Sequence, residues 1–141
     1  EYIDAYFDKF PRVKAMLDKM VQDGHTHEYV TTPFGRRSYI NIHGQGWENN
    51  CKNSPIQGGG ADMTKMWQIQ LWYLCREEGV PYPVCMVVHD ELVLDVPTHM
   101  VDEYVNLLTQ SFEQTIRTIF PNSPVPFEFE YFVGDTWGEK S

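Results

Sequence analysis

The sequence predicts an α+β fold in which long helices pack against short antiparallel strands. Apolar residues recur at spacings of three and four over long stretches, which is typical of amphipathic helices. Two short β-branched runs flank a polar turn near residue 90, as a β-hairpin requires. Hydrophobic residues make up 42% of the 141 residues, so a packed core can form and intrinsic disorder is excluded.

The first predicted element is an amphipathic helix over residues 2–22. Pro11 lies within this pattern, and a proline removes a helical hydrogen bond, so we expect a break or kink near Phe10. Gly24 follows the last apolar residues and is expected to end the helix as its C-terminal cap.

An extended segment and a second long helix are expected next. Residues 29–42 contain two short extended pieces, with a turn at Gly35 between them. A helical pattern follows over residues 47–78. Pro55 and three consecutive glycines at 58–60 are expected to disturb its first third, since each glycine costs roughly 1 kcal/mol relative to alanine. Such glycines suit a place where another backbone or a ligand comes very close.

The last third of the chain predicts a hairpin, a helix and a strand. Residues 84–96 contain the two β-branched runs of the hairpin. Thr98 is placed to cap a helix over about 99–119, which Pro121 ends. Apolar residues then recur at every second position over residues 125–133, so a half-buried strand is expected there.

Composition and charge exclude several functional classes. The 20 acidic and 11 basic residues give a net charge of −9, which argues against a free-standing nucleic-acid-binding protein. The three cysteines form no CxxC pair, which favours reduced thiols over a disulfide framework or a zinc site. No apolar run approaches ~18 residues, so no membrane span is expected. The chain begins with Glu1 in a helical pattern, so we expect a preceding portion, on this chain or another.

The strongest local signal for chemistry is His89-Asp90-Glu91 at the predicted hairpin tip. Two adjacent carboxylates repel each other unless a cation lies between them. Mg²⁺ binds one or two protein carboxylates together with phosphate oxygens. The turn therefore predicts half of a Mg²⁺ site, and a polar turn in solvent is the alternative that its local chemistry leaves open.

Two further groups of polar residues suggest contacts with nucleic acid. Asn53 and Gln57 lie four residues apart, on one face of the predicted helix, and amides can bind base edges in the minor groove. Arg36 and Arg37 follow the turn at Gly35, and adjacent guanidinium groups suit phosphate contacts. In isolation, a polar helix start explains Asn53 and Gln57 better than base contacts do. A solvated basic turn explains the two arginines at least as well as phosphate contacts do.

Together, the motifs resemble the C-terminal segment of family A DNA polymerases, of the DNA polymerase I type found in bacteria and phages. The resemblance covers essentially the whole chain. It rests on five stretches in the expected order: Tyr6-Phe7-x-x-Phe10-Pro11-x-Val13, Thr32-x-Phe34-Gly35-Arg36-Arg37, Asn53-x-Pro55-x-Gln57-Gly58-x-x-Ala61-Asp62, Val88-His89-Asp90-Glu91 and Gly134-Asp135-x-Trp137. The fold that it implies is the palm half of the polymerase, an antiparallel hairpin packed on long helices, at residues 46–141. Residues 1–45 would form a helical segment on the fingers side.

The resemblance also implies an activity and a role for each site residue. The implied activity is template-directed DNA polymerase activity in replication or repair, with nucleotidyl transfer to a primer 3′ end by a two-metal mechanism that uses Mg²⁺. The implied catalytic and metal-binding residues are Asp90 and Glu91. The implied DNA-binding residues are His89, Gln57, Asn53, Arg36 and Arg37.

The chain departs from the family pattern in two ways. Single positions differ from the common family residues at Ser38, Asn49, Gly59 and Gly60. More importantly, the sequence contains neither the family's first metal-binding aspartate motif nor its nucleotide-binding helix. We therefore expect inactivity alone and a partner, either an upstream portion or a separate chain, that supplies both. The other expected partners are primer–template DNA and dNTP, in the cytoplasm of a bacterium or of a phage-infected host.

Two other interpretations remain open at this point. A single-subunit RNA polymerase resembles this family but usually has serine where Glu91 stands, so Glu91 favours DNA synthesis. A non-catalytic scaffold or regulatory module with a decayed polymerase fold is the second alternative. The intact His89-Asp90-Glu91 stretch and Gln57 argue against such decay.

Overall fold

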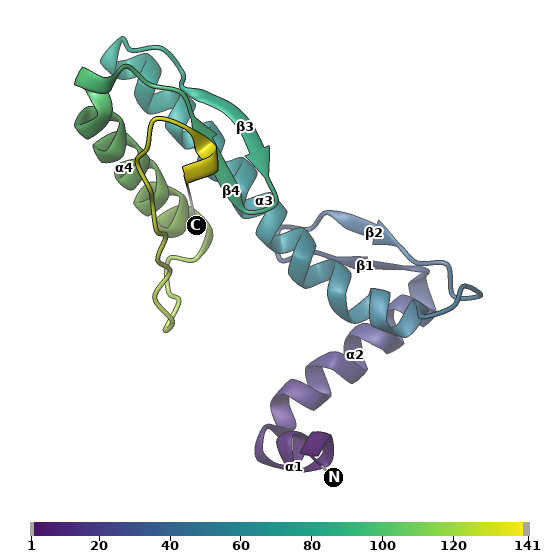
Figure 1. The fold of residues 1–141 in the computed structure, drawn as a ribbon. Coiled ribbons are helices and arrows are strands. Elements are labelled where there is room, and N and C mark those ends of the chain that lie inside the picture. The colour runs from purple at the N-terminus through teal and green to yellow at the C-terminus, as the bar shows by residue number, and fades with distance from the viewer. Residues whose placement is uncertain (1, 140–141) are drawn as a thin grey trace. The chain divides into compact units, whose positions relative to one another are not determined.

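The structure of the protein is a computed structural model that describes residues 2–139. It contains helices and two small antiparallel sheets, which confirms the α+β fold class (Figure 1). The chain divides into two compact units, one ending at Asp62 and one beginning at Met63. In chain order the elements are α1 (Tyr2–Lys9), α2 (Pro11–His27), β1 (Tyr29–Thr31), β2 (Arg37–Tyr39), α3 (Trp47–Glu78), β3 (Val84–Val88), β4 (Glu91–Leu94), the 3₁₀ turn η1 (Thr98–Met100), α4 (Val101–Ile119) and the 3₁₀ turn η2 (Trp137–Glu139).

The break near Phe10 is confirmed, because α1 ends at Lys9 and α2 begins at Pro11. A proline is tolerated in the first turn of a helix, where its missing N–H has no helical partner. The prediction that Gly24 ends the helix is wrong. Helix α2 continues to His27 and ends at Glu28, whose φ of 58° is left-handed.

Gly24 has a packing role instead of a capping role. It is buried within α2, and a Cβ at this position would overlap the sulfur of Cys51 in α3. Cys51, Val30 and Ile40 form the small hydrophobic core of the first unit. The glycine therefore allows α2 to approach α3 closely within this core.

The two extended pieces before α3 form the antiparallel pair β1–β2, as predicted. Tyr29 lies opposite Tyr39, and Thr31 lies opposite Arg37. Gly35 stands in the turn between the strands with φ of 84°, a conformation that glycine adopts without steric cost.

Helix α3 is continuous through Pro55 and the three glycines, so the expected disturbance of its first third is not observed. The glycines instead allow close approach of the β1–β2 turn. A Cβ at Gly58 would lie 2.7 Å from Thr32 Cγ2, and one at Gly59 would lie 3.1 Å from Pro33 Cδ. The neighbours of Gly58 and Gly59 are therefore side chains of this turn and not another backbone or a ligand, and a Cβ at Gly60 would meet nothing within 4 Å.

The second unit is built around the C-terminal half of α3, which packs against α4 (Figure 1). The buried Trp67 of α3 donates its indole N–H to the Leu108 carbonyl at 3.2 Å and to Ser111 Oγ at 2.9 Å. The hairpin β3–β4 covers this core with Leu92 and Leu94, which pack against it. The buried residues of the core are Trp67, Leu71, Leu74, Cys75, Tyr104, Leu107, Leu108 and Phe112.

Two predictions for the last third of the chain are wrong. Thr98 begins a 3₁₀ turn and does not cap α4, whose N-cap residue is Met100 without a side-chain hydrogen bond. Residues 125–133 form no strand. The two sheets among residues 2–139 are β1–β2 and β3–β4, and neither includes this segment. The alternation in its sequence has another cause: Phe127 and Phe129 pack partly buried against the core.

Candidate functional site

The predicted hairpin tip exists, and it presents its polar residues to solvent. The pairing of Val88 with Glu91 leaves His89 and Asp90 as a two-residue turn, and both are exposed. His89 has φ of 54°, in the left-handed region that non-glycine residues seldom adopt. Backbone strain of this kind tends to persist at functional sites, where the surrounding structure holds it in place.

Glu91 is held by a contact that its local sequence does not predict. The indole Nε1 of Trp137 donates a hydrogen bond to Glu91 Oε1 at 3.0 Å. The turn η2 that carries Trp137 is itself closed by Glu139, whose carboxylate accepts hydrogen bonds from the Asp135 N–H and from Thr136 Oγ1. Trp137 belongs to the last stretch of the family resemblance, but a contact across 46 residues leaves no periodic signal in the sequence.

The acidic pair has the chemistry of a partial Mg²⁺ site. Asp90 forms no side-chain hydrogen bond or ion pair with any residue between 2 and 139, so its oxygens remain available to a cation. Within this part of the chain, no group of three or more His, Cys, Asp or Glu residues could hold a metal ion. Mg²⁺ needs only one or two protein carboxylates when phosphate oxygens and water complete its shell. Asp90 and Glu91 therefore fit a Mg²⁺ site that phosphate oxygens and water complete, and not a site formed by protein ligands alone.

The two predicted minor-groove residues lie on the exposed side of the first half of α3. Asn53 and Gln57 are both exposed and one helical turn apart, so they share a face. Their amides form no hydrogen bond with other residues in the described part of the chain, and each can donate and accept. The arrangement allows two amides to contact neighbouring groups of one ligand.

The two arginines of the β1–β2 turn have different surroundings. Arg36 donates from Nε to Asp62 Oδ1 at 2.7 Å and from Nη2 to the Gly58 carbonyl at 3.1 Å. The guanidinium of Arg37 lies 4.6 Å from the ring centroid of Tyr29. Arg37 has no hydrogen bond or ion pair from its side chain to residues 2–139.

The structure thus gathers the predicted residues into two groups. Arg36, Arg37, Asn53 and Gln57 belong to the unit that ends at Asp62. The turn at residues 89–91 belongs to the unit that begins at Met63.

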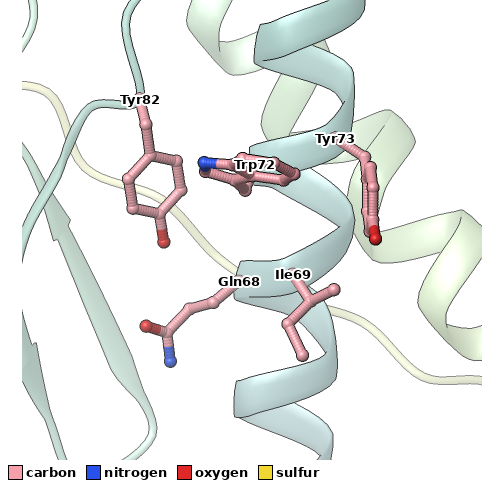
Figure 2. A pocket seen from close by; sticks show the side chains of 5 residues that line it. All are labelled: Gln68, Ile69, Trp72, Tyr73 and Tyr82. Carbon is pink, nitrogen blue, oxygen red and sulfur yellow. The ribbon is translucent and has the colours of Figure 1, made fainter.

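A shallow, mainly apolar pocket lies elsewhere in the second unit. It is lined by Gln68, Ile69, Trp72 and Tyr73 of α3 and by Tyr82 from the connection to β3 (Figure 2). Burial raises the pKa of the Tyr82 hydroxyl above its ordinary value, and Cys75 adds to this effect. The lining residues of the pocket include no carboxylate, histidine or thiol, which are the usual metal ligands in proteins.

None of the helices in residues 2–139 is both long and apolar enough to cross a membrane.

Comparisons with known proteins agree with the resemblance noted in the sequence. The family model for DNA polymerase family A matches residues 1–139. DNA polymerase I of Geobacillus stearothermophilus is 34% identical over 144 residues, which cover 97% of this chain and 16% of the relative. DNA polymerase I of Streptococcus pneumoniae is 36% identical over 146 residues, which cover 98% of this chain and 16% of the relative. The chain therefore spans about a sixth of the length of these relatives.

A solved structure has a similar fold. The POL domain of Pol1 from M. smegmatis, in complex with DNA primer-template and dNTP, superposes with a TM-score of 0.71 and 26% sequence identity. The match covers 80% of this chain and 21% of that chain.

Proposed function

Because this chain belongs to DNA polymerase family A, we propose that it forms part of the active site of a template-directed DNA polymerase. The reaction is nucleotidyl transfer from a dNTP to a primer 3′ end, in DNA replication or repair. One observation carries the proposal: an exposed two-residue turn presents Asp90 to solvent, directly before Glu91 at the start of β4.

The acidic turn contributes one carboxylate group to a two-metal site. Asp90 is proposed to bind Mg²⁺ directly, and Glu91, oriented by the indole of Trp137, to lie beside it. When two such ions are bound, they stabilise the attacking 3′ hydroxyl and the leaving pyrophosphate during an in-line displacement. The remaining contribution of the protein is positioning and charge stabilisation, as is general for phosphoryl transfer.

The DNA contacts are proposed to come from exposed polar residues on both compact units. His89, next to Asp90 in the turn, would contact the primer strand. Asn53 and Gln57 would hydrogen-bond to acceptors in the minor groove, which lie at similar places in every base pair. Such contacts test the geometry of a base pair without reading its sequence. The basic turn at Arg36 and Arg37 would lie near the phosphate backbone.

In this proposal, a second carboxylate group and the nucleotide-binding helix come from residues outside these 141. They are proposed to belong to an upstream polymerase portion, in the same polypeptide or in a separate chain, so that this segment alone does not extend primers. Functionally, residues 1–45 would belong to the fingers side and residues 46–141 to the palm, whereas the structural units divide after Asp62. Since the relatives are bacterial DNA polymerases, we propose the cytoplasm of a bacterium or of a phage-infected host as the site of action.

The test is primer extension by the polymerase that contains this segment, with Asp90→Ala. We expect extension to fall by at least about a thousandfold, equivalent to ~4 kcal/mol of transition-state stabilisation. Primer–template affinity should stay within about threefold of that of the unmodified enzyme. Asp95→Ala is the matched control, because Asp95 is an exposed aspartate that directly follows β4 in the same hairpin. Extension by Asp90→Ala within tenfold of the unmodified enzyme would contradict the metal assignment.

A further inference from the structure

We propose that Arg36 and Arg37 have separate roles, and that Arg37 together with Tyr29 and Tyr39 forms a binding surface for the phosphate backbone of primer–template DNA. Arg36 acts as a positioning residue that fixes the β1–β2 turn on α3. This inference rests on the proposed function, because it takes primer–template DNA as the ligand.

Arg36 is committed to contacts within its own unit. Its guanidinium spans the Asp62 carboxylate and the Gly58 carbonyl, and its backbone N–H donates to Thr32 Oγ1 at 3.2 Å. Backbone hydrogen bonds from the Thr32 N–H to the Arg36 carbonyl and from the Gly35 N–H to the Thr32 carbonyl close the turn, both at 2.9 Å. The turn and α3 are therefore joined through one arginine side chain.

The ion pair with Asp62 also compensates the positive charge of Arg36, which therefore attracts an external phosphate less strongly. The Asp62 side chain is only 13% exposed, so its negative charge is poorly screened by water and lies against the guanidinium. A phosphate that approached Arg36 would have to compete with this carboxylate and with the Gly58 carbonyl. Because the donors are arranged as a planar fork, a lysine at this position could not make both contacts.

Arg37 is the first residue of β2, and its side chain has different contacts from that of Arg36. Its guanidinium stacks on Tyr29, whose ring lies edge-on to Tyr39 with centroids 6.1 Å apart. Arg37 and Tyr39 are exposed, and Tyr39 is 79% exposed. The five N–H donors of the Arg37 guanidinium remain available, because this side chain makes no hydrogen bond within residues 2–139.

This surface has the chemistry of a backbone contact. A guanidinium binds two phosphate oxygens at once, and aromatic rings beside it offer flat apolar contact to sugars and bases. The tyrosine ring also holds the arginine in place, which reduces the side-chain freedom that is lost on binding. In a chain of net charge −9, one uncompensated arginine on an aromatic face gives a local positive site.

The experiment measures primer–template affinity against salt concentration for the polymerase that contains this segment. Each phosphate contact contributes about 0.9 to the slope of log affinity against log salt for duplex DNA. Arg37→Gln is expected to reduce the slope by that amount and to weaken binding at all salt concentrations. Arg37→Lys keeps the charge and should keep the slope. Arg36→Gln is expected to leave the slope unchanged, although it removes the same formal charge.

The positioning role of Arg36 has its own readout. Hydrogen exchange of the turn residues should become faster in Arg36→Gln and also in Arg36→Lys, which keeps the charge. Hydrogen exchange of the turn residues in Arg36→Gln combined with Asp62→Asn should be no faster than in either single variant. The effects of Arg37→Gln and Asp62→Asn on this exchange should be additive. An equal fall in slope for Arg36→Gln and Arg37→Gln, or no fall for either, would overturn the inference. Loss of extension activity is not one of these readouts, so failure of the proposed catalytic role remains distinguishable.

Discussion

The two turns that carry the predicted functional residues are both short connections between antiparallel strands, yet they are built in opposite ways. In the β1–β2 turn, the charge of Arg36 is bound by Asp62 and the turn is fixed on α3. In the β3–β4 turn, Asp90 has no cationic partner among residues 2–139 and stands exposed beside a strained His89. The charge of Arg36 is therefore compensated within the chain, whereas the charge of Asp90 is left for a ligand to neutralise.

This difference shows how a structure separates residues for positioning from residues for binding. Arginine and carboxylate partners within the chain make a rigid element whose charge is already compensated. Exposed and uncompensated groups are the ones that gain most from an external ion or phosphate. By this criterion, we propose Asp90 and Arg37 as binding residues, and Arg36 and Trp137 as residues that position them.

The largest effect expected from a change outside the acidic residues concerns Trp137. Trp137→Phe keeps the ring but removes the hydrogen bond to Glu91, so the carboxylate should sample more orientations. We expect primer extension at limiting Mg²⁺ to fall by about tenfold, which corresponds to ~1.4 kcal/mol. Part of this loss should be recovered at high Mg²⁺.

A matched control for Trp137 is Trp72→Phe. Trp72 is an exposed tryptophan in the same unit, and it stacks on Arg76. Equal losses in the two variants, or a loss in Trp137→Phe that is independent of Mg²⁺, would mean that Trp137 does not orient Glu91 for metal binding.

The glycine face of α3 tests the anchoring of the first turn. Gly58→Ala should destabilise the protein by about 1 kcal/mol, because its Cβ would lie 2.7 Å from Thr32 Cγ2 and 2.9 Å from Arg36 Nη2. Gly60→Ala, two residues further along the helix, meets nothing within 4 Å and should stabilise it by up to ~1 kcal/mol through helix propensity. Thermal unfolding measures both. Stabilisation in both variants would show that the turn does not lie tightly on α3.

The smallest expected effect is on thiol reactivity. Cys85 is exposed, whereas Cys51 and Cys75 are buried. Burial raises the pKa of both buried thiols above the ordinary value of 9.0, and Glu48 raises that of Cys51 further. Because the thiolate is the reactive form, alkylation at pH 8 should label Cys85 first. Labelling of the other two should increase only as the pH rises above 9, as mass spectrometry would show. Early labelling of Cys75 would contradict its burial.

Features that depend on neighbouring residues were predictable from the sequence. The break at Phe10, the limits of α3 and the hairpin around residue 90 follow from a proline, from helical spacing and from β-branched runs. The composition of the candidate acidic turn was evident for the same reason. Each of these signals lies within one element and needs no knowledge of tertiary packing.

Several of the errors and omissions involve contacts between distant residues. Gly24 resembles a helix end in sequence, but Cys51 requires a small residue inside the helix. Residues 125–133 alternate like a strand, although packing of aromatic side chains alone accounts for the pattern. The pairs Arg36–Asp62 and Glu91–Trp137 are 26 and 46 residues apart, so neither could be inferred from local spacing.

The most direct test of the account compares Asp90→Ala with Arg37→Gln in the same polymerase, with extension rate and salt-dependent DNA affinity measured for each. We predict that Asp90→Ala loses extension by at least about a thousandfold and keeps the salt slope. We predict that Arg37→Gln keeps its extension rate at saturating DNA within about threefold and loses about 0.9 from the slope. Similar effects of both changes on both quantities would contradict the division of metal and phosphate binding between the two turns.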